Sequence, residues 1–336
     1  MVVAGKQGLL ARWRYVLRTT NSPEGDVDVV SRWLVLTRAA VLPMTLTAGL
    51  VAGLLAVGDD GFRWELFLLA LLGITLAHVS NNLMNDLFDV EVGSDTDSYP
   101  RALYAPHPVL SGMISRRGLA TAALAVNVVD LAIGLILFTQ RGWPVLAFAV
   151  AGFFLSAAYT APPFRLKKRG LGEPDVLVVW GPLMVGGTYY AAVGEIPWEV
   201  IAASIPYGLL CTAVLMGKHI DKIPYDAPIG IRTLPVVLGE QRARRATQGM
   251  VAAFYATVVA CVAVGAMPWP ALITLAGLPV ARKVWKSLDE PRPAAPPKNF
   301  PVWPLWFAAI CFLHTRRAGL LLILGLAAGA ALDAIL

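Results

Sequence analysis

The sequence predicts an all-α, polytopic membrane protein with nine transmembrane helices. Of its 336 residues, 57% are hydrophobic and only 15% are charged, and the mean hydropathy is +0.63. This charge content is well below that of soluble globular proteins. Apolar stretches of about 20 residues, the length that crosses roughly 30 Å of hydrocarbon as a helix, recur along the chain. They lie near 36–57, 65–84, 119–138, 143–160, 174–193, 198–217, 247–266, 268–282 and 318–336.

The distribution of basic residues predicts how the chain is oriented. Arginines and lysines gather before the first stretch and after the second, fourth, sixth and eighth. The connections after the first, third, fifth and seventh stretches hold only Arg63 and Arg141. Cytoplasmic loops carry an excess of Lys and Arg. We therefore expect a multi-pass protein of the cell membrane with its N-terminus in the cytoplasm and its C-terminus outside. The net charge of +6 is accounted for by these loops, so no nucleic-acid partner is inferred.

The chain is expected to form one membrane domain. Residues 1–30 are interpreted as a cytoplasmic N-terminal lead-in, and residues 31–336 as a single transmembrane domain. Two acidic clusters end the second and the sixth apolar stretch, which suggests two related halves whose acidic ends meet on the cytoplasmic side. Three cysteines lie in apolar segments without metal-binding spacing and are expected to be small core residues. They are Cys211, Cys261 and Cys311.

The first acidic cluster has the residue types of a magnesium site. If the second apolar stretch continues as a helix to about Asp89, then Asn82, Asn85, Asp86 and Asp89 are three or four residues apart and share one face. This face offers only oxygen ligands, which Mg²⁺ prefers and which phosphate oxygens usually complete. The glycine and terminal acid of a Ca²⁺ loop are absent. A solvated acidic loop is the alternative, which the cost of carboxylates at a membrane helix end disfavours.

Two further segments combine acids and bases near membrane ends. The segment from Lys218 to Asp226 interleaves both charges, which suits a metal together with the phosphates that it bridges. The loop from Tyr159 to Gly170 carries four cations that suit a diphosphate. For each segment the alternative is an ordinary cytoplasmic loop, in the second case one that only sets the topology.

The fifth apolar stretch contains two features that suit a cavity. Gly181-Pro182 and the glycine pair that follows indicate a kink, close helix contact or room for a ligand. Tyr189 is interpreted either as lining a cavity or as an anchor at the membrane interface.

Three ordered motifs resemble the UbiA superfamily of intramembrane prenyltransferases, over roughly residues 32–336. They are Asn85-Asp86-Leu87-Phe88-Asp89 with Asp95, Tyr159-Thr160-Ala161-Pro162-Pro163-Phe164-Arg165-Leu166-Lys167, and Asp226 before Gly230-Ile231-Arg232-Thr233-Leu234. Segments around Val92-Gly93-Ser94-Asp95 and Gly181 to Tyr190 resemble the branch that prenylates 1,4-dihydroxy-2-naphthoate. The resemblance implies a nine-helix bundle around a central cavity, in which two Asp-rich motifs bind Mg²⁺ and a polyprenyl diphosphate.

The resemblance also implies roles for individual residues. Asn85 and Asp89 match the leading pair of the first motif, and Asp226 matches the last Asp of the second. Lys222 stands where the family has the first Asp of the second motif, with Asp221 one residue earlier, and Lys218-His219-Ile220 replaces an Asn-rich stretch.

The implied site residues fall into three groups. The expected metal ligands are Asp86, Asp89, Asp95, Asp221 and Asp226, of which Asp86, Asp89 and Asp226 are expected to be catalytic. The expected diphosphate contacts are Arg165, Lys167, Lys218 and Arg232. The other expected substrate-binding residues are Asn82, Asn85 and Tyr159, with His219 or Tyr189 positioning an acceptor.

Three functions are compatible with these patterns to different degrees. The main hypothesis is a Mg²⁺-dependent transfer of a polyprenyl group from its diphosphate to an aromatic quinone precursor, in which metal and cations stabilise the leaving group and the apolar cavity excludes water. A membrane terpene cyclase, in which the substrate's own double bond attacks the cation, is the alternative that the altered Lys218-His219-Ile220 stretch keeps open. A transporter is disfavoured, because its ionisable groups usually lie near mid-membrane on broken helices.

Overall fold

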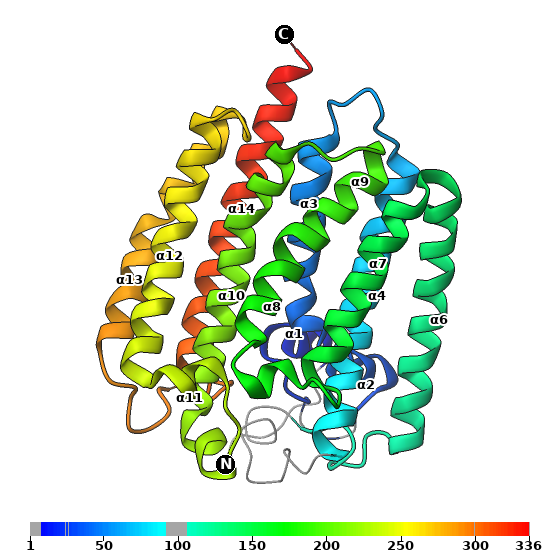
Figure 1. Ribbon diagram of the computed structural model, residues 1–336. Coiled ribbons are helices and arrows are strands. Elements are labelled where there is room, and N and C mark those ends of the chain that lie inside the picture. Colours follow the sequence, from blue (N-terminus) through cyan, green and yellow to red (C-terminus); the bar gives the residue numbers. More distant parts are fainter. Residues whose placement is uncertain (1–7, 24, 26, 92–105, 299, 336) are drawn as a thin grey trace.

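The structure is a computed structural model that describes residues 8–23, 25, 27–91, 106–298 and 300–335, with the backbone alone for residues 89–91. In this part of the chain every regular element is a helix, and the long helices run side by side in one bundle (Figure 1). The predicted all-α membrane fold is confirmed. Asp95 lies outside the described residues, as does the side chain of Asp89.

Eight helical segments of the described chain are long and apolar enough to cross a membrane. Each overlaps one predicted stretch, although α4, α10, α12 and α14 extend several residues beyond it. They are η1 (Ala39–Val41) with α3 (Leu42–Ala56), α4 (Trp64–Glu91), α6 (Arg116–Arg141), α7 (Trp143–Thr160), α8 (Gly172–Val178) with η3 (Val179–Gly186) and α9 (Gly187–Val193), α10 (Trp198–Asp226), α12 (Glu240–Ala263) and α14 (Trp306–Asp333).

The eighth predicted stretch, 268–282, has a different form. It consists of the 3₁₀ segment η5 (Trp269–Gly277) followed by α13 (Leu278–Asp289). Figure 1 shows α13 running beside α12, and η5 packs against α14. Three basic residues of α13, Arg282, Lys283 and Lys286, reduce its hydropathy, so this segment is not one of the eight.

The fifth membrane segment bends where the sequence predicts a kink. Gly181 has φ −87° and ψ −105°, which is not helical, and Pro182 follows it within the π-helical segment η3. Proline removes a backbone donor and clashes with the preceding turn, and π-helical turns absorb such irregularities. An ideal Cβ on Gly181 would lie 3.3 Å from the carbonyl oxygen of Ser204, so the bend also allows α10 to approach.

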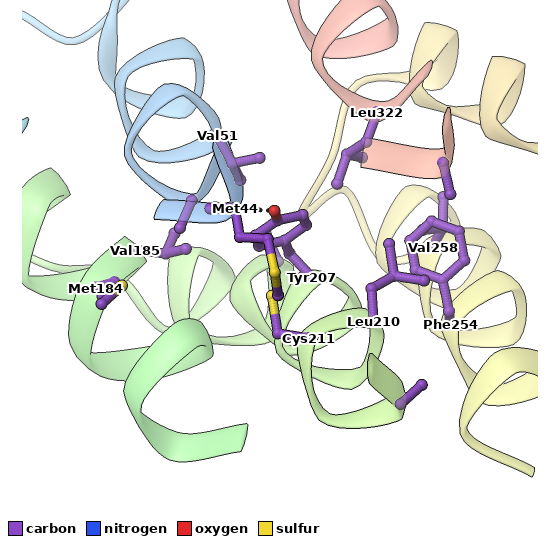
Figure 2. Packing of buried hydrophobic residues seen from close by; sticks show 14 of the residues in the cluster. Met44, Val51, Met184, Val185, Tyr207, Leu210, Cys211, Phe254, Val258 and Leu322 are labelled. Atoms are coloured by element: carbon purple, nitrogen blue, oxygen red, sulfur yellow. Dashed lines mark hydrogen bonds between the residues drawn. The ribbon is translucent and has the colours of Figure 1, made fainter. Parts of the chain in front are cut away.

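Helix α10 is the centre of the core. Figure 2 shows its residues Tyr207, Leu210 and Cys211 between side chains of α3, η3, α12 and α14. The Tyr207 hydroxyl donates to the carbonyl oxygen of Met44 over 2.8 Å, which satisfies the polar end of this buried ring. Cys211, Cys261 and Cys311 are all buried and free, as expected of small core residues.

The described part of the N-terminal lead-in contains a helix. Helix α1 (Leu9–Thr19) is tied to α2 (Val29–Leu36) because Trp13 Nε1 donates to Asp28 Oδ1 over 3.0 Å. Asp28 also caps α2, accepting from the backbone N–H of Ser31 at 2.9 Å and from its hydroxyl at 2.6 Å. These hydrogen bonds, led by that of the Ser31 side chain, lower the pKa of Asp28 to about 2.

Candidate active site

A cavity of about 650 Å³ lies inside the bundle. Its walls come from α3, α4, α6, α7, the α8–η3–α9 segment, α10 and α14, and most of the lining residues are apolar. Its polar residues include several near the ends of α4, α7 and α10, which lie together at the lower end of the bundle in Figure 1. The cavity therefore combines an apolar interior with a charged end.

The two described acids of the helix ends lie beside lining residues but do not line the cavity themselves. Asp86 in α4 and Asp226 in α10 are both fully buried and belong to helix ends on the same side of the bundle (Figure 1). Asp86 accepts a hydrogen bond from Arg38, and His107 Nε2 lies 4.0 Å from the same carboxylate oxygen. Asp226 Oδ1 lies 3.7 Å from Lys222 Nζ. Asp86 and Asp226 thus both lie beside basic groups.

The amides of α4 line the cavity as their spacing predicts. Asn82 donates from Nδ2 to the carbonyl oxygen of Thr37 over 3.0 Å, and Asn85 Oδ1 accepts from the hydroxyl of Thr160. These contacts tie α4 to the segment before α3 and to the end of α7. The amide face is therefore held in place by its neighbours before any substrate binds.

Two of the four predicted diphosphate contacts line the cavity. Lys167 does so, with Nζ 5.8 Å from the ring centroid of Tyr159, which also lines it, and so does Lys218 in α10. Arg165 and Arg232 are not among the lining residues. Arg165 adopts φ 47° in the same loop, and its buried Nε has no hydrogen-bond partner in the described part of the chain.

The loop that contains Arg232 still packs on the basic loop. Arg232 is exposed, and its backbone N–H donates to the carbonyl oxygen of Lys168 over 3.2 Å. The loop that contains Arg232 and the basic loop are therefore neighbours, although Arg232 does not line the cavity.

Helix α10 presents three basic or imidazole side chains to the cavity, namely Lys218, His219 and Lys222. Lys218 and Lys222 are four residues apart and so share one face. His219 is buried, and its Nδ1 lies 2.7 Å from Glu173 Oε1. With Glu173 ionised, Nδ1 donates to it and Nε2 is the nitrogen left for a substrate.

The structure places Asp221 away from the predicted metal site. Its two carboxylate oxygens accept from the backbone N–H groups of Phe307 and Ala308 at 3.1 and 2.9 Å, and it is not among the lining residues. Asp221 therefore caps the first turn of α14, where backbone donors lack helical partners. The next residue, Lys222, lines the cavity instead.

Tyr189 also lies outside the cavity lining. Its hydroxyl donates to Asp59 in the connection between α3 and α4, at the other end of the bundle from the charged end (Figure 1). Of the two interpretations of Tyr189, the structure favours the anchor near a helix end.

Three residues that line the cavity are missing from the sequence-based predictions. Arg38 and Asp175 lie near the start of predicted membrane stretches, and His78 lies inside one. Ionisable residues within or beside apolar stretches are costly and commonly functional. That criterion alone, applied to every stretch, would have selected them.

The oxygen donors at the charged end fit a magnesium ion that keeps other ligands. Within the described residues no three His, Cys, Asp or Glu side chains cluster closely enough to hold a metal by themselves. The described donors, Asp86, Asp226, Asn82 and Asn85, are all hard oxygens, although Asp86 and Asn85 already accept from Arg38 and Thr160. Mg²⁺ is usually bound through one or two carboxylates, waters and substrate phosphates, so this donor set suits it.

An apolar cavity inside a helical membrane bundle, with lysines lining one end, is typical of a binding site within the membrane. The model of the UbiA prenyltransferase family matches residues 44–310. The chain belongs to this family and is a prenyltransferase.

Curated relatives agree with this assignment. The chain is 28% identical over 258 residues to the 2-carboxy-1,4-naphthoquinone phytyltransferase of Synechocystis sp., covering 75% of this chain and 80% of that protein. It is 31% identical over 246 residues to the 1,4-dihydroxy-2-naphthoate octaprenyltransferase of Mycobacterium tuberculosis, covering 72% and 79%.

Solved structures share the fold at low sequence identity. The apo structure of a UbiA homolog from Aeropyrum pernix K1 has a TM-score of 0.61 at 20% identity and covers 87% of this chain and 98% of that chain. A UbiA homolog from Archaeoglobus fulgidus bound to GPP and Mg²⁺ has a TM-score of 0.55 at 17% identity, covering 87% and 99%.

Proposed function

We propose that the protein is a Mg²⁺-dependent prenyltransferase that moves a polyprenyl group from its diphosphate to an aromatic quinone precursor. The observation that carries the proposal is the cavity, whose interior is apolar and whose charged end carries Lys167, Lys218 and Lys222. A polyprenyl diphosphate has the same division into an apolar tail and an anionic head. The curated relatives named for naphthoate acceptors support the aromatic acceptor.

The basic side chains and the apolar walls of the cavity have different roles in this proposal. Lys167 and Lys218 bind the diphosphate and stabilise the negative charge that grows on it as the allylic C–O bond breaks. The apolar walls hold the tail and exclude water that would otherwise capture the allylic cation. Arg165 and Arg232 lie outside the cavity lining and steer the anion from the neighbouring loops.

Magnesium belongs to the same end of the cavity. Asp86, Asp89, Asp95 and Asp226 are the residues that we propose to hold it, directly or through water, with Asn82 and Asn85 beside them. Bound Mg²⁺ supplies Lewis-acid assistance to the departure of diphosphate. Asp221 is left out of this set because it caps α14.

His219 is proposed to orient the acceptor, with Tyr159 bordering the same end of the cavity. Glu173 fixes the imidazole ring by accepting from Nδ1 at 2.7 Å, so Nε2 is held in one orientation. Tyr189 is not part of this proposal.

The proposal is tested with purified protein, Mg²⁺ and geranylgeranyl diphosphate, with no acceptor, 1,4-dihydroxy-2-naphthoate or 4-hydroxybenzoate, and mass spectrometry of the products. We expect a prenylated aromatic product only with an acceptor, and none when EDTA removes the metal. A cyclic hydrocarbon formed without acceptor would instead establish the terpene cyclase. Failure to release diphosphate under any condition would overturn both enzyme functions.

Asp89→Asn tests the metal site in the same assay. We expect loss of nearly all Mg²⁺-dependent diphosphate release, because an amide is a much weaker ligand for Mg²⁺ than a carboxylate. Unchanged release would remove Asp89 from the mechanism.

A further inference from the structure

The wall formed by α8 and η3 carries polar atoms that the described protein does not satisfy. Asp175 is only 8% exposed, and its Oδ1 has no hydrogen-bond partner within the described chain. The indole Nε1 of Trp180, five residues further on, is likewise buried without a partner there. Both residues line the cavity. Neither is used by the function proposed above.

An unsatisfied carboxyl group inside a membrane bundle is costly. Buried polar groups in folded proteins are almost always hydrogen-bonded, and ionisable residues at membrane depth usually mark a substrate or ion pathway. An unpartnered group that lines a cavity can recover this cost when a ligand donates to it. The position of Asp175 therefore indicates a ligand with a hydrogen-bond donor.

The surroundings of Asp175 favour an aromatic ligand. The rings of His78 and Trp180 meet edge to face with centroids 5.2 Å apart, and both residues line the cavity. Thr45 Oγ1 lies 2.7 Å from His78 Nδ1, which fixes the imidazole ring. Aromatic side chains of this kind pair well with another ring. Five helical residues rise about 7.5 Å along the axis, so Asp175 and Trp180 reach the cavity at different depths.

Asp175 also lies close to the charged end of the cavity. The first residue of its helix, Gly172, is packed so tightly that an added Cβ would lie 3.0 Å from the Cα of Lys167 and 3.3 Å from the ring of Tyr159. Asp175 follows Gly172 by less than one helical turn. A ring bound at Asp175 is therefore beside the residues proposed to bind the diphosphate head, where the acceptor must meet the prenyl group.

We propose that Asp175 and the rings of His78 and Trp180 form the acceptor subsite, in which the Asp175 carboxylate accepts a hydrogen bond from a ring hydroxyl of the aromatic acceptor. This inference rests on the proposed function and specifies the acceptor as a hydroxylated aromatic compound. Asp175 is a specificity-determining residue in this scheme, and it takes no part in diphosphate binding.

The test compares binding of two ligands to three proteins. The ligands are the acceptor that the wild-type protein prenylates, 1,4-dihydroxy-2-naphthoate or 4-hydroxybenzoate, and its mono-O-methyl ether. The proteins are the wild type, Asp175→Leu and, as a control at a carboxyl group on another cavity wall, Asp130→Asn. Equilibrium affinities are measured in nanodiscs together with the affinity for geranylgeranyl diphosphate and the Tm.

We expect the wild type and Asp130→Asn to bind the free hydroxyl form about tenfold or more tightly than the ether, as loss of one charge-assisted hydrogen bond implies. Asp175→Leu is expected to bind both forms alike and to bind the diphosphate within about twofold of the wild type. Its Tm is expected to be equal or higher, since the substitution removes an unsatisfied buried carboxyl group. A merely structural role would lower the Tm instead.

Two outcomes overturn the inference and are distinct from failure of the proposed function. If Asp175→Leu still discriminates the hydroxyl form from the ether, or if it weakens diphosphate binding as much as acceptor binding, Asp175 does not recognise the hydroxyl group. If the wild type prenylates neither acceptor but 1,4-dihydroxy-2-naphthoate binding still depends on Asp175, the proposed function fails while the subsite remains.

Discussion

At the scale of single residues, the basic side chains near the charged end divide into those that line the cavity and those that do not. Lys167 and Lys218 line it, whereas Arg165, Arg169 and Arg232 do not. The sequence of the basic loop cannot make this division, because all its cations are close together along the chain. The division predicts unequal effects from neighbouring substitutions of similar chemistry.

Lys167→Met is expected to raise the KM for prenyl diphosphate about ten- to hundredfold, because one charge-assisted contact to the head group is lost. Arg169→Met is the matched control, since Arg169 is exposed in the same loop and does not line the cavity. Steady-state kinetics at saturating Mg²⁺ measure both. Equal changes in KM for the two variants would contradict the assignment.

Asp221→Ala separates capping from metal binding. The variant is expected to lose about 1–2 kcal/mol of stability, because two backbone donors at the start of α14 lose their acceptor. The Mg²⁺ concentration for half-maximal activity is expected to stay the same. Asp221→Asn, which keeps one acceptor oxygen, should lose less stability. A large shift in the Mg²⁺ requirement without a loss of stability would restore Asp221 to the metal site.

At the scale of elements, the packing of α10 on α14 positions both the Asp221 cap and the cavity wall. An ideal Cβ on Gly217 would lie 2.8 Å from the backbone carbonyl atoms of Phe307, which is closer than real Cβ atoms come. Small residues allow membrane helices to approach this closely. Gly217 therefore sets the distance between α10 and the first turn of α14.

Gly217→Ala is expected to destabilise the protein by about 1–3 kcal/mol, since the added methyl group meets backbone that cannot move aside without shifting α14. Gly249→Ala in α12 is the matched control, because nothing lies within 4 Å of its ideal Cβ. That change is expected to be neutral or slightly stabilising, as alanine is the better helix former. Thermal unfolding in detergent compares the two, and similar losses would refute the packing explanation.

At the scale of the whole molecule, the bundle has two distinct ends, and the positive-inside pattern assigns the charged end to the cytoplasm. The connection between α3 and α4 lies at one end, and the connection between α13 and α14 lies at the other (Figure 1). Sidedness and the expected relation between two halves of the chain remain predictions.

Sided labelling tests the orientation. Asp60→Cys is expected to react with a membrane-impermeant maleimide on intact cells, whereas Ala294→Cys should react only after permeabilisation. Both positions are exposed, and the three native cysteines are buried, so background labelling should be low. The reverse pattern would invert the topology, and labelling of both from one side would exclude opposite ends.

The sequence predicts the fold better than it predicts the direction in which individual side chains point. Hydropathy predicts nine membrane stretches, and eight of them correspond to long apolar helices of the described chain, because membrane thickness fixes their length. It does not say which face of α10 meets α14. Asp221 and Lys222 are adjacent and therefore differ by about 100° in direction, and only the packing decides that Asp221 caps a helix while Lys222 lines the cavity. The pairing of Arg38 with Asp86 joins residues 48 positions apart and has no local signature.

The end of helix α1 and the residues after it contact distant parts of the chain. Arg18, Thr19 and Thr20 belong to the cavity lining, and Asn21 Nδ2 donates to the carbonyl oxygen of Pro301, 280 positions later, over 2.9 Å. Removing these residues to ease expression is therefore expected to remove part of the cavity wall. Recombinant versions should keep them, and a tag or fusion joined to them is expected to affect this part of the cavity.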